Sequence, residues 1–215
     1  MTLDDALPLL DATVGIPFKE LFEDLPIDLR TNKGNVGQML LLHIGLMLDS
    51  NLKDFDDGEL KTNKADEAGN PRETMFITQV SRQIDDYVSP TPLRFEDTTI
   101  YEKIKNLVFL PVCKDSKNRE EWFFVSCHHV NLAERPKILA QLTEDYNFIT
   151  RKLRTDIETA EDGFIHTSSG KFIQVRSKDA KPYNAIYSKT YDRLVSNKNH
   201  AFYFQKDFMR HCRNL

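Results

Sequence analysis

The sequence predicts a protein of the α/β (α+β) class, built around a central mixed sheet. Short segments typical of strands lie on both sides of a long helical region, 131–157. Within that region apolar residues recur at helical spacing, at Leu132, Ile138, Leu139, Leu142, Tyr146, Ile149 and Leu153. The chain has 215 residues, 40% of them hydrophobic, so we expect one domain with a substantial core.

Composition argues against a membrane or secreted protein. The longest apolar stretch, 39–48, contains His43 and is too short to span a bilayer. The N-terminus lacks the pattern of a secretory signal. The three cysteines form no C-x-x-C pair and are typical of reduced thiols. We therefore expect a cytoplasmic protein with no membrane partner.

Charge is distributed unevenly along the chain. Residues 1–100 contain 9 Lys or Arg and 19 Asp or Glu, a net charge of −10, whereas residues 101–215 contain 20 and 14, a net of +6. Residues 163–215 hold 10 basic and 3 acidic side chains, a net of +7. This asymmetry fits an acidic catalytic half and a basic half that meets phosphates, although a charged surface without a partner would give the same count.

The N-terminal elements are predicted to be helices. Segments 3–10 and 17–25 are typical of short amphipathic helices, and 36–48 is apolar enough to be a buried helix. Lys33 and Gly34 stand just before that helix. A lysine beside free helix N–H groups can clamp a phosphate, but a glycine turn with a solvated lysine fits equally well.

Strand candidates follow in both halves. A strand beginning at Glu59 and its expected neighbour, 73–80, come first, and segments 107–112 and 122–126 complete the mixed sheet. Further on, 170–178 and 201–206 are predicted strands, and 208–215 is a basic helical tail. The adjacent pair His128 and His129 is assigned no function, because neighbouring strand residues point in opposite directions.

Asp54, Glu59 and Lys61 form the D-x(n)-E-x-K arrangement of a metal-dependent nuclease. On a strand, Glu59 and Lys61 share one face while Leu60 enters the core. The two carboxylates would be hard oxygen ligands for Mg²⁺, and the lysine could orient the attacking water during phosphodiester hydrolysis. The alternative is a solvated acidic turn.

Basic residues end the strand 170–178. A loop presenting Arg176, Ser177 and Lys178 is suited to reading a DNA groove, since Arg or Lys can bond guanine bidentately. An ordinary basic hairpin is the alternative.

Taken in order, these pieces resemble the MutH mismatch-repair endonucleases and the related GATC-cutting type II restriction enzymes. The resemblance runs from about Val14 to the C-terminus. It rests on KGNVG at 33–37, DF at 54–55 with ELKT at 59–62, PRETMF at 71–76, KIKNLVFLPV at 103–112, FIQVRSK at 172–178 and FYFQK at 202–206.

The resemblance implies a restriction-endonuclease-like fold with two lobes around a DNA cleft, a catalytic lobe of about 1–112 and a DNA-reading lobe of about 113–215. It implies double-stranded DNA as the partner and Mg²⁺ as the cofactor, in a bacterial, nucleoid-associated protein. By position, Asp54 and Glu59 match the metal carboxylates, and Lys61 and Lys103 match active-site lysines. The matching DNA-binding positions are Lys33, Arg176, Ser177, Lys178, Tyr203 and Lys206, with Tyr203 near the adenine whose methylation the family senses.

The chain departs from the family at three places. Leu41 replaces a family glutamate four residues after Gly37, so one active-site carboxylate is missing. Asp54 stands two residues closer to Glu59 than in MutH, as in some restriction enzymes. Ser177 occupies the position of a proline in the reading loop, which affects the expected recognition sequence.

Two classes of function follow from this resemblance. The first is a Mg²⁺-dependent endonuclease cutting at GATC or a related site, either a restriction enzyme paired with a cognate methyltransferase or a nickase activated by mismatch-repair proteins. The departures favour the restriction enzyme. The second is a catalytically inactive DNA-binding effector module of the same fold, for which Leu41 would mark an early loss.

Overall fold

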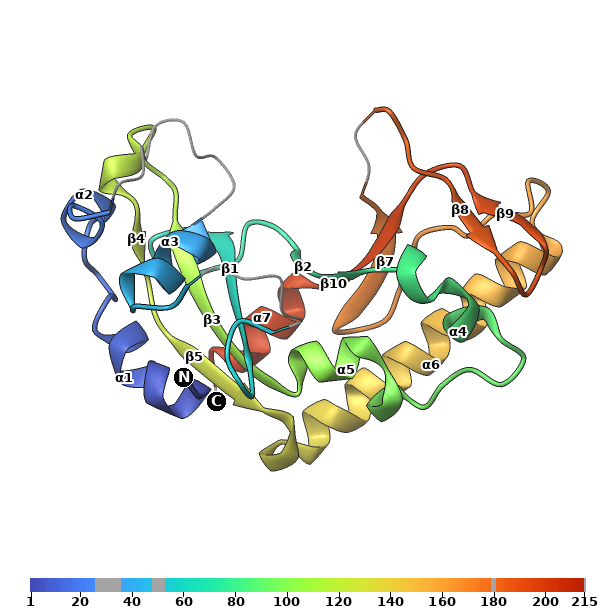
Figure 1. The fold of residues 1–215 in the computed structure, drawn as a ribbon, viewed down its shortest axis with the longest axis horizontal. Helices are drawn as coiled ribbons and strands as arrows, with labels where there is room; N and C mark the ends of the chain where they lie inside the picture. Colours follow the sequence, from blue (N-terminus) through green and yellow to red (C-terminus); the bar gives the residue numbers. More distant parts are fainter. Residues whose placement is uncertain (26–35, 48–52, 179–180, 215) are drawn as a thin grey trace. The chain divides into compact units, whose positions relative to one another are not determined.

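The computed structural model describes residues 1–25, 36–47, 53–178 and 181–214 (Figure 1). The chain forms two compact units that alternate along the sequence. Unit 1 comprises Met1–Met75, Lys103–Leu132 and Met209–Leu215, and unit 2 comprises Phe76–Glu102 and Ala133–Phe208. The chain therefore passes between the units four times. The predicted lobe boundary near residue 112 stays a prediction.

Unit 1 contains the predicted mixed sheet. Strand β1 (Glu59–Ala65) pairs in parallel with β3 (Asn106–Cys113). The other edge of β3 is antiparallel to two short strands, β4 (Phe123–Phe124) and β5 (His128–Asn131). This confirms the mixed α/β class and is compatible with a restriction-endonuclease-like fold.

Three N-terminal helices accompany this sheet (Figure 1). They are α1 (Leu3–Asp11), α2 (Phe18–Leu21) and α3 (Val36–His43). Their apolar faces form one core with the strands, including Leu3, Leu10, Phe18, Met39, Leu40, Leu60, Val108, Leu110 and Phe124. The sheet face that carries Leu60 is thus the buried face of β1.

Helix α3 is shorter than the sequence predicts. It ends at His43 rather than at Leu48, and Gly45 follows with a φ of +85°. This left-handed conformation is accessible to glycine at little cost and terminates the helix. The apolar run alone did not reveal the stop.

Unit 2 contains a second sheet in the order β2-β10-β7-β6. Its strands are β2 (Met75–Gln79), β10 (His200–Phe204), β7 (Ile173–Ser177) and β6 (Ser168–Ser169), with β7 antiparallel to both β10 and β6. The expectation that 73–80 lies beside β1 is therefore wrong: β2 pairs with β10, some 120 residues later, which no local pattern indicates.

The other elements of unit 2 surround this sheet. The predicted long helix is α6 (Pro136–Thr159), with Ile138, Leu142, Tyr146, Ile149 and Leu153 buried. A short helix α4 (Ile84–Val88) and a hairpin of β8 (Ile186–Ser188) and β9 (Arg193–Ser196) complete the unit. Helices α5 (Thr99–Ile104) and α7 (Lys206–Cys212) lie where the chain passes between units.

A buried carboxylate fixes the start of β7 to α6. Asp145 is 3% exposed and accepts hydrogen bonds from the backbone N–H groups of Lys171, Phe172 and Ile173, at 2.9, 2.6 and 3.1 Å. A Cβ at Gly170 would lie 2.4 Å from the Asp145 Cγ atom. The strand that carries Arg176 is therefore held at its beginning by a charged hydrogen-bond cluster.

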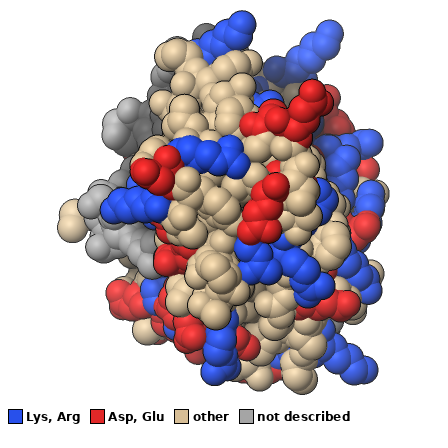
Figure 2. Space-filling model, turned by 90° about the vertical axis from the view of Figure 1, so that its right-hand side faces the viewer, with Lys and Arg blue, Asp and Glu red and all other residues tan. Residues whose placement is uncertain are grey.

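Figure 2 shows one side of the molecule, on which Lys and Arg are interspersed with Asp and Glu. The excess of basic residues in the C-terminal sequence therefore does not form a region of one sign on this side. Of the helices in the described ranges, none is both long and apolar enough to cross a membrane.

Candidate functional site

The strand β1 places Glu59 and Lys61 on one face, opposite the core residue Leu60, as the alternation predicts. The Glu59 side chain is buried, with a residue exposure of 3%. Lys61 donates a hydrogen bond to Glu59 Oε1. Lys103, on α5, places its Nζ atom 3.1 Å from the same oxygen. The structure thus brings both predicted lysines to one carboxylate oxygen.

The second oxygen of Glu59 differs from the first. Glu59 Oε2 is buried and has no hydrogen-bond partner among the described residues. A buried carboxylate oxygen without a partner is costly, because it has lost its water and gained nothing in return. Such an atom is open to a cation or to a donor from a ligand.

Asp54 lies in the turn before β1. Its Oδ2 accepts the Leu60 N–H at 2.9 Å. Surrounding protein atoms desolvate the carboxylate and Glu59 adds a negative charge, and together they raise the pKa of Asp54 above its ordinary value. The Leu60 N–H and the ammonium groups of Lys61 and Lys103 act in the opposite direction. The residue nevertheless remains solvent-exposed, so a ligand can reach it.

The donor set suits a hard divalent cation. Asp54 and Glu59 supply carboxylate oxygens, which Mg²⁺ prefers, and Mg²⁺ commonly takes only one or two protein carboxylates. Within the described ranges no group of three or more His, Cys, Asp or Glu residues could hold a metal ion. A cation here would therefore rely on two carboxylates, the orphaned Glu59 oxygen among them.

Leu41 lies in the apolar core of unit 1 and is 7% exposed. The position at which the family has a glutamate is thus occupied by a packed aliphatic side chain. The predicted phosphate-binding residue Lys33 lies outside the described residues.

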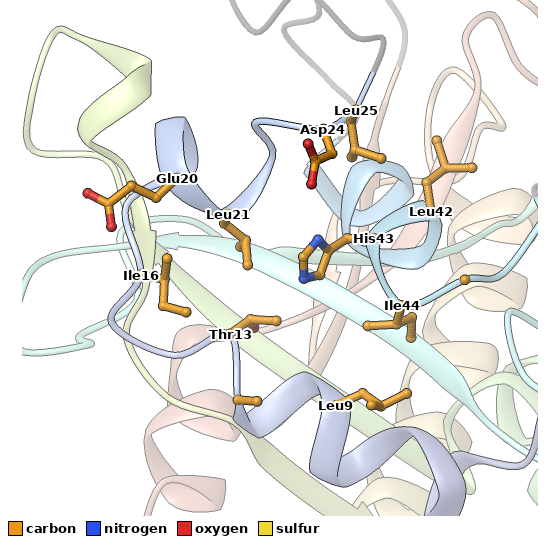
Figure 3. Close-up of a pocket in the computed structure, with 12 residues that line it drawn as sticks. Leu9, Thr13, Ile16, Glu20, Leu21, Asp24, Leu25, Leu42, His43 and Ile44 are labelled. Atoms are coloured by element: carbon orange, nitrogen blue, oxygen red, sulfur yellow. The ribbon is translucent and has the colours of Figure 1, made fainter.

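A pocket of about 710 Å³ in unit 1 contains none of the predicted site residues (Figure 3). It lies between α1, α2 and α3, and most of its lining is aliphatic, with Thr13, Glu20, Asp24 and His43 as polar members. The predicted catalytic residues therefore lie outside this pocket.

Unit 2 brings three of the predicted base-reading residues, Arg176, Lys178 and Tyr203, together, whereas Ser177 alternates to the other face of β7. The Arg176 guanidinium lies 4.4 Å from the centroid of the Tyr203 ring. Lys178 Nζ lies 3.9 Å from the ring of Phe76, and the Phe76 and Tyr203 rings meet edge to face at 5.7 Å. The four side chains form a row, Arg176–Tyr203–Phe76–Lys178, which we call the cation–aromatic row.

The row leaves its cations accessible. Arg176, Ser177 and Lys178 are exposed, whereas Tyr203 is only 8% exposed. Burial raises the pKa of Tyr203, and the Arg176 charge opposes this, so the phenol keeps its proton at neutral pH. The sixth predicted DNA-binding residue, Lys206, begins α7, two residues after the end of β10.

Sequence reasoning missed Phe76. It occupies a predicted strand, and its alternation with buried Met75 and Ile77 indicates a surface-facing aromatic residue. Its position beneath Lys178 depends on β2 pairing with β10, which the sequence did not reveal.

A mixed sheet that carries a buried glutamate with two lysines is compatible with the class of restriction-endonuclease-like proteins. Comparison with curated proteins finds similarity to the DNA mismatch repair protein MutH of Haemophilus influenzae, in the strains 86-028NP and KW20 / Rd. Each is 29% identical to this chain over 118 residues, 52% of this chain and 51% of the relative. The resemblance to MutH seen in the motifs is thus confirmed.

The chain spans about half the length of the curated relatives that it matches. No family model matches the chain.

Proposed function

We propose that the protein is a Mg²⁺-dependent, sequence-specific endonuclease acting on double-stranded DNA. The observation that carries the proposal is the buried Glu59, with two lysines on one oxygen and no partner among the described residues on the other. The similarity to MutH also supports an endonuclease.

Asp54 and Glu59 would hold the metal ion. When bound, a divalent cation polarises the phosphodiester and lowers the pKa of a nearby water. Lys61 and Lys103 then have two tasks of their own. Their ammonium groups can orient the attacking water, and they offset negative charge that develops on the phosphoryl oxygens in a largely buried site.

The cation–aromatic row would read the DNA sequence. Arg176 and Lys178 project from the end of β7 and can donate to guanine edges in the major groove. Stacking on Tyr203 holds the Arg176 guanidinium in one orientation, which reduces the entropy lost on binding. By resemblance, the site is GATC or a related short sequence, with Tyr203 near the adenine.

Among enzymes of this kind, we favour a restriction endonuclease whose cognate methyltransferase modifies the same site. Leu41 and the altered reading loop support this choice over a mismatch-repair nickase with activating partner proteins. Either enzyme would act on DNA in the bacterial cytoplasm, in association with the nucleoid.

A non-catalytic DNA-binding module is the second candidate. The burial of Leu41 in the apolar core favours it, because a carboxylate is absent where the family has one. The presence of Asp54, Glu59, Lys61 and Lys103 together argues for the enzyme, because burial and the Glu59 charge raise the pKa of Asp54 in spite of the two lysines.

The test is cleavage of supercoiled plasmid carrying unmethylated or adenine-methylated GATC sites, in Mg²⁺ or EDTA. Wild type is compared with Glu59→Ala and with Glu67→Ala, which removes an exposed carboxylate of the same unit. We expect cutting that needs Mg²⁺, survives Glu67→Ala and disappears in Glu59→Ala. The ratio of nicked to linear DNA separates a nickase from a restriction enzyme.

Specific binding of the plasmid without cutting in any divalent metal would reject the enzyme and support the binding module. Absence of both cutting and binding would reject the proposed function altogether.

A further inference from the structure

The turn that carries Asp54 is attached to the beginning of α1. The Leu3 N–H donates to Asp57 Oδ1 at 2.7 Å, across 54 residues of sequence. The Asp56 N–H donates to the Met1 carbonyl oxygen at 3.2 Å. A carboxylate at a helix N-terminus is also favoured by the helix dipole. The Met1 amino group also donates to Asp56 Oδ2 at 3.0 Å, so three interactions attach the turn to this helix end.

Gly58 brings the two segments into close contact. A Cβ at this position would lie 2.8 Å from Leu3 Cδ2 and 2.9 Å from the Asn106 carbonyl oxygen. Leu3 is fully buried and the carbonyl belongs to β3, so neither can easily retreat. The turn therefore fits between α1 and β3 only because residue 58 has no side chain.

The turn is also closed on itself. The Phe55 N–H donates to the Gly58 carbonyl oxygen at 3.0 Å, and the Phe55 ring is 4% exposed. Asp54 accepts the Leu60 N–H at the start of β1. Each residue from 54 to 58 is thus constrained, Asp56 through the ion pair that its Oδ2 atom forms with the Met1 amino group at 3.0 Å.

Helix α1 does not need Asp57 to begin. Thr2 is its N-cap, and Thr2 and Asp5 form a complete capping box. Loss of Asp57 would leave this cap in place. The hydrogen bond from Leu3 to Asp57 therefore fixes the position of the turn and is not required for α1 to begin.

We infer that Asp57 is a positioning residue for the metal carboxylate Asp54, which it holds through its bond to the start of α1. This inference rests on the proposed function, because it concerns the same cation site. Asp57 itself is assigned no contact with metal or DNA. Gly58 contributes to the same end by allowing the close approach of Leu3.

The experiment measures Mg²⁺ affinity by isothermal titration calorimetry on the full chain without DNA. Asp57→Ala removes the acceptor, whereas Asp57→Asn keeps an oxygen for the Leu3 N–H but removes the charge. Thr2→Ala is the matched control, since it weakens the start of α1 and leaves the turn intact. Gly58→Ala displaces the turn by another route.

We expect Mg²⁺ to bind about tenfold more weakly to Asp57→Ala and Gly58→Ala, as when outer partners of metal ligands are removed. Asp57→Asn should stay within about threefold of wild type, and Thr2→Ala should lower the melting temperature without changing affinity.

Equal affinity in wild type, Asp57→Ala and Gly58→Ala would overturn the positioning role while leaving the proposed function intact. An equal loss in Asp57→Asn and Asp57→Ala would show that charge alone matters, which also overturns it. If Asp57→Ala does not fold, the Mg²⁺ affinity of Gly58→Ala is the test of whether the position of the turn controls metal binding. A wild type that binds no Mg²⁺ would reject the proposed cation site and this role with it.

Discussion

Glu59 holds its negative charge in an almost closed environment. Removing a charge from water is expensive, and the cost is recovered only when both oxygens find partners. Lys61 and Lys103 satisfy one oxygen, and Glu59 Oε2 has none among the described residues. The unpartnered oxygen therefore costs stability, and under the proposed function a bound cation would offset that cost.

The raised pKa of Asp54 gives a prediction about pH. The folded state binds a proton on Asp54 more tightly than the unfolded chain does, so the ionised carboxylate lowers stability. The loss of folding stability is complete at pH values above the pKa of Asp54 in the folded protein. It is absent at pH values below the ordinary aspartate pKa of about 3.9. We expect Asp54→Asn to melt at a higher temperature than wild type at pH 7, and the difference to shrink toward pH 4.

The same melts, repeated with Mg²⁺, provide the control. A cation that binds only the folded protein raises its melting temperature, so wild type should gain and Asp54→Asn should gain little. Equal Mg²⁺ shifts in both proteins would contradict the assignment of Asp54 as a ligand.

Arg176 and Lys33 should differ in how they affect DNA binding. Under the proposed function Arg176→Ala removes a base contact, so discrimination between a GATC duplex and a random duplex should fall by about 1–3 kcal/mol. The sequence predicts that Lys33 contacts a phosphate, so Lys33→Ala should weaken binding to both duplexes and lower the salt slope by about 1. Fluorescence anisotropy across a salt series measures both.

Arg176→Lys tests the stacking on Tyr203. Lysine keeps the positive charge but lacks the planar guanidinium that stacks on the Tyr203 ring. Arg176→Lys should therefore discriminate between specific and random duplexes as poorly as Arg176→Ala does. Losses of equal size on specific and random duplexes for Arg176→Ala would remove its role as a base reader.

At the scale of elements, the connection between α6 and β7 depends on Asp145. Its carboxylate accepts three backbone N–H groups, and no water can replace it easily at 3% exposure. Asp145→Ala should therefore lower the free energy of unfolding by about 3 kcal/mol, measured in urea. Glu144→Ala, at the exposed neighbouring position, should change it by less than about 0.5 kcal/mol.

Gly170 supplies a second check on that connection. Gly170→Ala should destabilise wild type because its Cβ meets the Asp145 carboxylate, and should cost less in the Asp145→Ala background. Additive costs would mean that the two residues act independently.

Local sequence patterns predicted the helices and strands better than they predicted which strands pair with each other. Alternation placed Glu59 and Lys61 on one face correctly, because two residues along a strand always share a face. The long helix was predicted within a few residues at its ends, since its apolar stripe extends over six turns. The pairing of β2 with β10, and hence the place of Phe76, depends on contacts between distant segments that no short window contains.

The candidate site could be predicted only where its residues lie close together in the sequence. Asp54, Glu59 and Lys61 are close in sequence, so their proximity followed from one turn and one strand. Lys103 came only from the resemblance, because a residue 44 positions from Glu59 has no local signal. The attachment of the turn to Leu3 was not foreseen for the same reason.

At the scale of the whole molecule, the two units are interleaved in sequence. A fragment ending at residue 112 would lose β4 and β5, which cover one edge of β3, together with the core residue Phe124. We expect the fragment 1–112 to show no cooperative melting transition by circular dichroism, whereas the full chain shows one. A sharp transition in the fragment would mean that unit 1 needs less of the chain than its contacts suggest.

The interleaving also limits how such a protein can evolve. Unit 2 is made of two separate stretches, Phe76–Glu102 and Ala133–Phe208, so a single recombination event cannot exchange it for the corresponding unit of a relative. One crossover point would join half of one sheet to half of another. Under the proposed function, new sequence preferences should therefore arise by substitution within the cation–aromatic row, with the two units inherited together.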